Sequence, residues 1–413
     1  MKYGQLRQRA ATFDQKSKYH NLTLLEHIDK AVEYAKNKGY GAEVVEALEW
    51  HDFGKLFVFQ EGEDGQRHFT GHAEKSAELY PGTNERIRQL ILEHNTLITK
   101  RTIAKLGIDF CRELFDMQSA DQYAHSEFAR SHPQNIRNVR TSTDVLREAI
   151  KQDKITKRLK SDYEHLEGLG YEVVGVFLQG SQNYGLDTDH SDIDTKAIVL
   201  PTFDDFVLNR QPVSTTLEIG SLKEHIDVKD IRVGFATMKK GNINFTEILF
   251  TRYKKLNPKY SHVLAELFKQ AEQLATWNRK ALYSMIHGMA QEKLKALKHP
   301  YPSLLDKIER YGYDPKQLHH IIRLHDFLLG LLIGEPFKRC LISKNAELLK
   351  QVKLGKYALE EAELIAQDTC TEIKRLKDKA LSGDVEISPD VPKAYDVVCV
   401  KVLRQWFAEQ LKA

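Results

Sequence analysis

Two aspartates one residue apart, Asp192 and Asp194, follow a loop rich in Gly, Asn, Asp and Ser. The apolar, β-branched runs on either side, VVGVFL and KAIVL, predict two strands, with the aspartates on the second strand or at its entrance. Because side chains alternate along a strand, both carboxylates should point to one face, about 7 Å apart. Two carboxylates on one face repel each other, so this spacing favours a site that binds a pair of divalent cations.

A second group of chemistry-bearing residues lies in the first third of the chain, around the stretch WHDFGK. Six histidines and aspartates form the group: His27, His51, Asp52, His72, His94 and Asp121. Their order, with the flanking stretches LTLLEHIDKA, HFTGHAEKSA and FDMQSADQYAHS, resembles the HD superfamily of metal-dependent phosphohydrolases over residues 20–130. The nearest likeness is to the HD domains attached to some CCA-adding enzymes.

The HD resemblance implies a metal centre. One ion would be held by His27, His51, Asp52 and Asp121. Asp52 would bridge to a second ion held by His72 and His94, although these two histidines could instead contact substrate. Imidazoles and carboxylates suit transition metals such as Mn²⁺, Fe²⁺ or Ni²⁺. A metal-bound water becomes a usable hydroxide near neutral pH.

Other polar residues near these motifs have simpler expected roles. Lys55, four residues after His51, could pair with a substrate phosphate as a point charge and so assist catalysis. We expect His20, His68 and His125 to be surface or hydrogen-bonded histidines.

The stretch GSQNYG, Gly180 to Gly185, followed by SDIDTK, resembles the signature of polymerase-β-like nucleotidyltransferases. That resemblance implies that Asp192 and Asp194 bind Mg²⁺ ions that orient an NTP or dNTP and activate the attacking hydroxyl. The residues it assigns to the nucleotide are Gly180, Ser181, Gln182, Tyr184 and Arg323. Gly180 would let the backbone approach the triphosphate, and Ser181 with nearby amides would hold phosphate oxygens. Arg323 is equally compatible with a core-edge arginine.

The superfamily signature requires a third acid on a neighbouring strand. Asp227 fits best because it is flanked by apolar residues in EHIDVKDI, with Glu218 and Asp230 as weaker choices. Asp230 is better interpreted as the N-cap of the next helix. Glu247, in NINFTEILF, is expected to be exposed. We expect no metal site in HHIIRLHDF, because adjacent histidines face different directions on a helix.

A longer match, over about residues 172–405, resembles the predicted nucleotidyltransferases found beside RNA ligases in bacterial and phage RNA-repair neighbourhoods. It includes HIDVKDIRVGFATMKKGNINFTEILF and GYDPKQLHHIIRLHDFLLGLLIGEPF. Two departures are Gln182, where the group often has arginine, and Ile193, often aromatic. This resemblance implies an RNA acceptor, tRNA-like in character, and an RNA ligase in the same pathway.

Composition and periodicity place these motifs in an α+β multidomain protein. An all-α HD domain is expected over 1–150, a polymerase-β-like nucleotidyltransferase domain with a small mixed sheet over 151–255, and a helical C-terminal domain over 256–413. Strand signals are confined to about 172–233, and the polar stretch 131–150 could be a connector. The 413 residues, 41% hydrophobic and 29% charged, are typical of a soluble globular protein.

The cysteines and the apolar runs of the sequence indicate the cellular compartment of the protein. The four cysteines lack metal-type spacing and fit free thiols in a reducing cytoplasm. The N-terminus has no apolar core, and no apolar run approaches the roughly 20 residues that span a bilayer. We therefore expect a cytoplasmic protein without a membrane partner.

The sequence thus predicts a bifunctional enzyme that transfers a nucleotide to a hydroxyl, that of an RNA or tRNA 3′ end, and hydrolyses a terminal or 2′,3′-cyclic phosphate. One alternative is a signalling or protein-modifying nucleotidyltransferase with an HD hydrolase that reverses its action. Another is a nucleotide phosphohydrolase with an inactive transferase domain, which the intact pair Asp192 and Asp194 disfavours. A third is a non-catalytic RNA-binding module.

Overall fold

The fold is that of a computed structural model, which describes residues 2–188, 191–219, 224–301, 304–383, 385 and 387–412. The described chain is an α+β protein, as predicted, and divides into two compact units, 1–154 and 155–413. The boundary expected near residue 255 falls inside the second unit. Asp189 and His190, in the loop between the Gly-Ser and Asp-x-Asp motifs, lie outside the described residues.

The first unit is helical, apart from one short hairpin. Its elements are α1 (Tyr3–Ala10), α2 (Leu24–Lys38), α3 (Ala42–Trp50), α4 (Lys55–Val58), β1 (Gln60–Glu61), β2 (Arg67–His68), α5 (His72–Leu79), α6 (Glu85–Glu93), α7 (Lys100–Leu106), α8 (Ile108–Ala124) and α9 (Glu127–Ser131). Helix α10 (Pro133–Gly168) begins in this unit and ends in the second. The polar stretch 131–150, expected as a connector, is therefore helical from residue 133 onward.

Local sequence signals fix the ends of α2, the helix that carries His27. Thr23 accepts a hydrogen bond from the Glu26 backbone N–H, and the Glu26 carboxylate accepts one from the Thr23 N–H. This capping box satisfies two donors at the helix start. The helix ends at Gly39, whose φ of 70° is the left-handed conformation that glycine adopts without strain.

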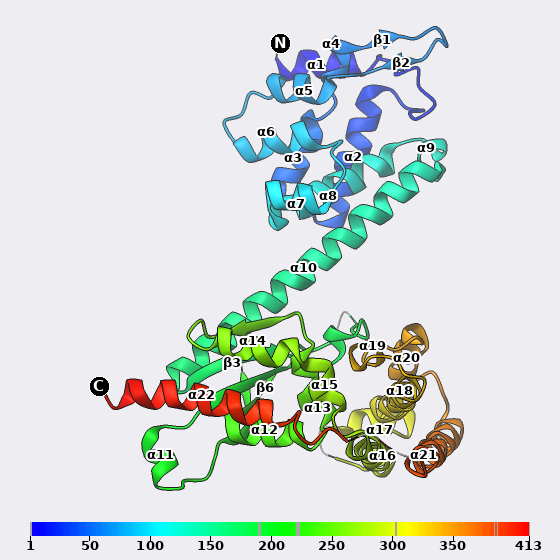
Figure 1. The fold of residues 1–413 in the computed structure, drawn as a ribbon. Coiled ribbons are helices and arrows are strands. Elements are labelled where there is room, and N and C mark those ends of the chain that lie inside the picture. The colour runs from blue at the N-terminus through cyan, green and yellow to red at the C-terminus, as the bar shows by residue number, and fades with distance from the viewer. Residues whose placement is uncertain are drawn as a thin grey trace. The chain divides into compact units, whose positions relative to one another are not determined.

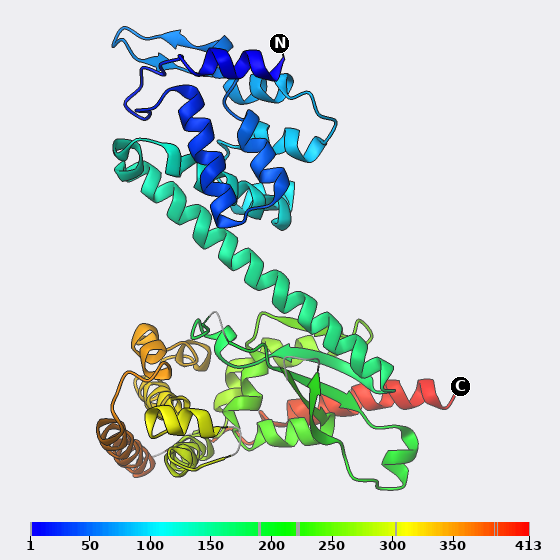
Figure 2. The same ribbon diagram turned by 180° about the vertical axis from the view of Figure 1, so that it is seen from behind.

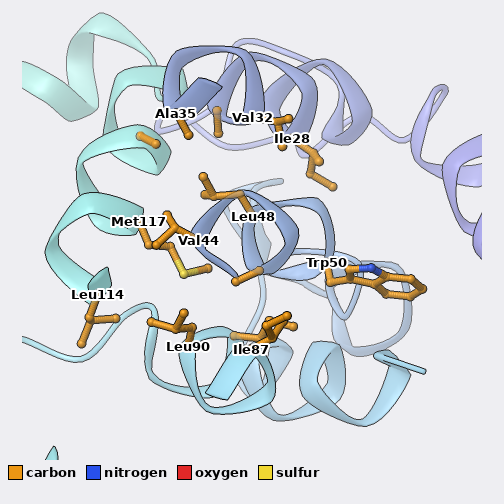
Figure 3. Close-up of a cluster of buried hydrophobic side chains, with 14 of the residues drawn as sticks. Ile28, Val32, Ala35, Val44, Leu48, Trp50, Ile87, Leu90, Leu114 and Met117 are labelled. Atoms are coloured by element: carbon orange, nitrogen blue, oxygen red, sulfur yellow. The ribbon is translucent and has the colours of Figure 1, made fainter. Parts of the chain in front are cut away.

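The core of the first unit lies between helices α2, α3, α6 and α8 (Figure 3). Apolar residues spaced three or four apart on each helix point inward, as an amphipathic pattern predicts. The labelled side chains in Figure 3 are Ile28, Val32, Ala35, Val44, Leu48, Trp50, Ile87, Leu90, Leu114 and Met117. This packing holds α2, α3, α6 and α8 in fixed positions, and these helices carry or directly precede five of the six metal-type residues; His72 begins α5.

The second unit combines a sheet with helices. Its strands are β3 (Glu172–Leu178), β4 (Thr195–Leu200), β5 (Ser214–Ile219), β6 (Glu224–Asp230) and β7 (Lys254–Leu256). Its helices are η1 (Ser181–Asn183), α11 (Phe203–Val207), α12 (Ile231–Lys239), α13 (Ile243–Thr246), η2 (Glu247–Leu249), α14 (Ser261–Lys269), α15 (Ala271–Thr276), α16 (Arg279–Ala296), α17 (Leu305–Tyr311), α18 (Pro315–Leu332), α19 (Phe337–Cys340), α20 (Ala346–Lys353), α21 (Leu359–Leu381) and α22 (Lys393–Gln410).

The described strands of the second unit form a mixed sheet with the order β5-β6-β4-β3-β7. Only β4 and β6 run parallel among these pairs. Strand β7 lies outside the range of predicted strands. Its sequence, Lys-Lys-Leu, carries no β signal, and its strand conformation depends on pairing with β3. This is a case in which tertiary pairing overrides local propensity.

Helices cover both faces of this sheet (Figures 1 and 2). Ile155 and Leu159, in the second half of α10, pack on one face against Val176, Val199 and Val228. Helices α12, α14 and α22 pack on the other face. Helices α16, α18, α20 and α21 share a separate core, which also includes Tyr184 and Leu186 from the loop after β3. The Gly-Ser loop is therefore packed against the helical part of the same unit.

Gly54, in the HDFGK motif, offers a test of how tightly the first unit is packed. A Cβ added there would lie 2.2 Å from the backbone oxygen of His72 and 2.8 Å from the backbone nitrogen of Ser76. We expect Gly54→Ala to lower the free energy of unfolding of this unit by about 2 kcal/mol, because the backbone of α5 must shift. Urea denaturation measures it, with Gly41→Ala as the control, since an added Cβ there meets nothing within 4 Å. Equal losses in both variants would contradict the packing argument.

Candidate functional site

The six predicted histidines and aspartates of the first unit converge on one centre. They come from α2, the C-terminal ends of α3 and α6, the start of α5, and α8. Asp52 lies in the middle. Its Oδ2 is 3.3 Å from His27 Nε2 and 3.5 Å from His51 Nε2, and its Oδ1 is 3.4 Å from His72 Nε2 and 3.8 Å from His94 Nε2. One carboxylate thus faces two pairs of imidazoles, which is the arrangement a bridging ligand needs.

Backbone hydrogen bonds fix the tautomer of three of these histidines. The Nδ1 atoms of His51, His72 and His94 lie 2.7, 2.6 and 2.7 Å from the carbonyl oxygens three residues earlier. Since a carbonyl oxygen can only accept, each Nδ1 carries the proton, and Nε2 of the neutral ring carries a lone pair. Metal-binding histidines are oriented in this way by a hydrogen bond from the other ring nitrogen.

The lone pairs face other acceptors across the centre. His51 Nε2 lies 3.3 Å from Asp121 Oδ1, and His72 Nε2 lies 3.2 Å from His94 Nε2. Acceptor atoms this close repel each other unless a cation or a proton lies between them. Three groups of ligand atoms result among the described residues: His27, His51, Asp52 and Asp121 form one, Asp52, His72 and His94 form another, and His20, His27 and His125 form the third. The donor set therefore fits one or two divalent ions.

The charge state of the centre suits a cation. Burial alone would raise the pKa of Asp52, but His51 and Lys55 beside it hold that pKa well below its usual range. Burial lowers the pKa of His94 to about 3, which keeps its ring neutral. Burial also opposes protonation of His27, yet the carboxylates of Asp121 and Asp52 raise the pKa of His27 to about 9. Asp52 is therefore ionised and His94 neutral, as metal ligands must be, whereas His27 must lose its proton before it can bind a metal.

Lys55 contacts the metal-type centre through the carboxylate of Asp52. Its Nζ lies 2.7 Å from Asp52 Oδ2, 3.0 Å from Gln15 Oε1 and 3.3 Å from His20 Nε2. An ammonium group has three protons, and these three acceptors can use all of them. Lys55 therefore orients the central carboxylate, and its pairing with a substrate phosphate stays a prediction.

His20 and His125, which we expected to be surface or hydrogen-bonded histidines, lie against the ring of His27 in this centre. The ring of His125 stacks on that of His27 with 5.3 Å between centroids, and the ring of His20 lies 4.9 Å from His27. The signal for His125 was its position four residues after Asp121, one helical turn away. His20 precedes α2 and carries no such periodic signal. His68 is exposed, as expected.

Asn95 is a further residue that the sequence analysis missed. Its Nδ2 lies 3.1 Å from His72 Nε2 and 2.9 Å from His94 Nε2. An amide nitrogen donates, so this contact agrees with lone pairs on both imidazole atoms. Its place directly after His94 in the chain was the available clue.

The second candidate site is a cavity of about 710 Å³ in the second unit. Four of the predicted residues line it from the sheet side: Gly180, Ser181, Asp192 and Asp194. Helices α17, α18 and α20 line the opposite side, with Arg323 among their residues. The structure therefore brings the Gly-Ser loop, the Asp-x-Asp motif and Arg323 together.

Backbone geometry explains why the Gly-Ser loop and the aspartates meet. Gly180 has a φ of 78°, which favours glycine, and the Gln179 N–H donates to the Asp194 carbonyl oxygen at 3.0 Å. Asp192 and Asp194 immediately precede β4, which begins at Thr195, so they lie at the strand entrance. Asp194 Oδ1 is buried and has no hydrogen-bond partner among the described residues. A buried carboxylate oxygen without a partner fits a cation ligand.

Asp227 lies on β6, next to β4, but is not one of the described residues that line the cavity. Lys196 Nζ is 3.5 Å from Asp227 Oδ2, and Lys229 Nζ is 3.1 Å from Asp227 Oδ1. Two lysines therefore neutralise the acid that we expected to complete the metal site. Asp230 caps α12, as predicted, by accepting from the Arg232 N–H, and Glu218 is exposed on β5.

Tyr184 and Gln182 contact residues that line the cavity. The Arg323 guanidinium lies 4.0 Å above the centre of the Tyr184 ring, a cation–π contact. Gln182 Nε2 donates to the Ser191 carbonyl oxygen at 3.4 Å. Neither residue lines the cavity among those described. Their placement suits holding Arg323 and the loop before Asp192, and their contact with a nucleotide stays a prediction.

Glu247 was expected to be exposed, and this expectation is wrong. Its side chain is 5% exposed and lines the cavity, because the short helices α13 and η2 turn it toward the Gly-Ser loop. Burial raises the pKa of Glu247 to about 8, although Arg323 and the Gly180 N–H both act to lower it. The pattern NINFTEILF gave no sign of this, since a single acid in an apolar helix usually faces solvent.

Two histidines of α18 also line the cavity. His319 Nδ1 donates to the Leu349 carbonyl oxygen at 2.9 Å, and His320 lies beside it. Within the described ranges, His319, His320 and His325 belong to no cluster of three metal-ligating side chains. That these histidines form no metal site stays a prediction.

Comparisons with known proteins add little to the geometry. No protein-family model matches the chain, and no curated protein matches it. Among solved structures, the chain is similar to a nucleotidyltransferase-like protein from Exiguobacterium sibiricum 255-15, with 16% identity and a TM-score of 0.25. That match covers 56% of this chain and 76% of the other. Among the described residues, no helix is long and apolar enough to cross a bilayer.

The burial of Glu247 predicts a pH-dependent stability. Its folded pKa of about 8 lies above its ordinary value of 4.5, so the folded state holds the proton more tightly. The stability this contributes is fully present below about pH 4.5 and is lost as the pH rises to about 8, by up to about 1.4 kcal/mol per pH unit. Glu247→Gln should therefore gain stability relative to the wild type between pH 5 and pH 8.5 in urea denaturation. The exposed Glu218→Gln serves as the control, and a constant difference across this range for Glu247→Gln would contradict the assignment.

Proposed function

We propose that this protein is a bifunctional enzyme that processes nucleic-acid ends. The first unit would be an HD-type metal-dependent phosphohydrolase, and the second a Mg²⁺-dependent nucleotidyltransferase that uses an NTP or dNTP. The observation that carries the proposal is the Asp52 carboxylate, which faces two imidazole pairs with its two oxygens. A buried acid in such surroundings has no evident structural purpose and is suited to divalent ions.

In the first unit, some residues would bind metal ions and others orient those ligands. His27, His51, Asp121 and Asp52 would hold one ion, and Asp52, His72 and His94 a second. Bound ions would supply a hydroxide nucleophile and neutralise phosphoryl charge. Lys55 orients Asp52, and the backbone carbonyls hold the histidine rings with Nε2 inward. Mn²⁺, Fe²⁺ or Ni²⁺ suits this imidazole-rich set better than Mg²⁺ does.

In the second unit, Asp192 and Asp194 would hold Mg²⁺, which supplies charge neutralisation at the triphosphate and activation of the acceptor hydroxyl. Gly180 and Ser181 would position phosphate oxygens, and Arg323 lines the same cavity. The acceptor that best joins the two chemistries is an RNA 3′ end, tRNA-like in character, because the hydrolase could expose the hydroxyl that the transferase needs. An RNA ligase would then act in the same pathway.

A second candidate is favoured by one observation. Lys196 and Lys229 neutralise Asp227, which the transferase would need as its third acid. If that neutralisation persists with nucleotide bound, the second unit would bind nucleotides without transferring them, and the protein would be a phosphohydrolase alone.

The metal assignment predicts the composition of the purified protein. His51→Ala and Asp52→Ala should each lose most of the transition metal, because each removes a ligand that no neighbour can replace, and phosphohydrolase activity should fall by at least about a hundredfold. Elemental analysis measures the metal, and release of phosphate from phosphomonoesters and 2′,3′-cyclic phosphates measures activity. His68→Ala, which alters an exposed histidine outside the centre, should behave like the wild type. Equal metal content in all four proteins would rule out the centre.

The proposed coupling predicts how two variants treat two RNA ends. The wild type should add a labelled nucleotide to RNA that ends in a 2′,3′-cyclic phosphate, because it can expose the 3′ hydroxyl, whereas Asp52→Ala should not. Both proteins should extend RNA that already ends in a 3′ hydroxyl, and Asp192→Asn should extend neither RNA.

The measurement is a gel of labelled-nucleotide incorporation with each NTP. Retained phosphate release by Asp192→Asn would show that the two sites act separately. If the wild type extends neither end but labels a protein, the signalling alternative replaces the RNA proposal. If it labels nothing while still releasing phosphate, the phosphohydrolase alone remains.

A further inference from the structure

The cavity of the second unit has several cations on its helical side. Asp192 and Asp194 line it from the loop before β4, and Lys196 lines it from β4 itself. Helices α17, α18 and α20 contribute the acid Asp306 and a larger number of cations, and Asp314 precedes α18. These cations are Lys307, Arg310, Lys316, Arg323 and Lys353. Such a lining suits a ligand with several negative charges that also reaches metal-binding carboxylates.

Lys353, the last residue of α20, lies close to the loop before β4. It is half-buried, and its Nζ donates to Ser191 Oγ at 3.2 Å, one residue before Asp192. Burial lowers the pKa of Lys353, and the nearby Lys316 lowers it further. Asp192 and Asp187 raise it, but less strongly. The ammonium group therefore sits in a partly dehydrated position close to another cation.

Most of these cations lack a direct acidic partner. Among the described residues, no carboxylate oxygen lies within 4.0 Å of the side-chain nitrogens of Lys353, Lys316 or Arg310. Exposed lysines often lack partners, and Lys316 and Arg310 are exposed. Lys353 is different, because its ammonium group is half-buried near Lys316, and Asp192 and Asp187 offset this cost only in part, so a further anion would stabilise its charge.

The size of the cavity and its charge limit the class of anion. A volume of about 710 Å³ accommodates a small organic ligand rather than a single phosphate. The ligand must reach from the Asp192–Asp194 pair, next to Lys353, toward Lys316 on α18. A triphosphate chain has charges spaced along its length, and lysine is a common point-charge partner of phosphate.

We propose that Lys353, assisted by Lys316, binds the terminal phosphates of a nucleoside triphosphate, so that the helical part of the second unit selects triphosphates over monophosphates. This inference rests on the proposed nucleotidyltransferase function and adds its substrate-selecting residue. The hydrogen bond from Lys353 to Ser191 also places the lysine where it can approach a ligand held by the following aspartate.

The test measures binding rather than transfer. Calorimetry with Mg²⁺ would compare an α,β-methylene nucleoside triphosphate with the corresponding monophosphate, for the wild type, Lys353→Gln and Lys353→Arg. Loss of one charge-assisted contact should weaken triphosphate binding about tenfold or more in Lys353→Gln and leave monophosphate binding unchanged. Lys353→Arg keeps the charge and should retain most of the affinity.

The matched control is Lys350→Gln, which removes a lysine three residues earlier on the same helix that does not line the cavity among the described residues. It should bind both ligands like the wild type. Unchanged triphosphate affinity in Lys353→Gln would overturn the inference, and so would equal losses for both ligands, which would indicate a disturbed loop at Ser191.

The outcomes also separate this inference from the proposed function. Transfer activity that is unaffected by Lys353→Gln at limiting nucleotide would leave the function standing and remove the inference. Triphosphate binding that depends on Lys353, in a wild type that extends no acceptor, would support the inference and count against the transferase.

Discussion

The first unit is organised around one buried carboxylate, that of Asp52. A charged group 1% exposed is stable only when partners surround it. Those partners come from α2, α4 and α5 and from the residues that follow α3 and α6, and the hydrophobic core packs α2, α3 and α6 against one another. Lys55 compensates the charge from one side, and the imidazoles present lone pairs from the others. Backbone contacts fix the rings of His51, His72 and His94, which is the preorganisation that metal chemistry requires, whereas Nδ1 of His27 has no hydrogen-bond partner among the described residues.

The second unit builds its cavity from a sheet and a group of helices. The loop before β4 brings Asp192 and Asp194, and α18 and α20 bring Lys316, Arg323 and Lys353. Glu247 accepts a hydrogen bond from the Gly180 N–H and lies near Arg323. The Tyr184 ring contacts the Arg323 guanidinium. The Gly-Ser loop is therefore linked to the helices through side chains, so a change in the helices would reach the backbone of this loop.

Much of the first site could be predicted from the sequence because its motifs are local. His51 and Asp52 are adjacent, and the ordered histidines each end or begin a helix with a clear apolar period. His20 escaped prediction because its place depends on how the chain before α2 folds back over Lys55. Glu247 escaped for the same physical reason: burial of an isolated acid is decided by tertiary packing, which no short pattern records. Strand β7 likewise owes its conformation to β3.

The two donor sets explain how one chain could hold two kinds of ion at once. The first centre offers four imidazoles, nitrogen ligands that bind transition metals more readily than Mg²⁺. The second centre offers the carboxylates of Asp192 and Asp194 just before β4, and these hard oxygen ligands suit Mg²⁺. In the proposed enzyme, each ion would therefore remain in its own site without a selective barrier between the units. The chemistry follows the same division: a tightly held transition metal suits hydrolysis, whereas Mg²⁺ that arrives with a triphosphate suits transfer, because it binds and leaves with the substrate and product.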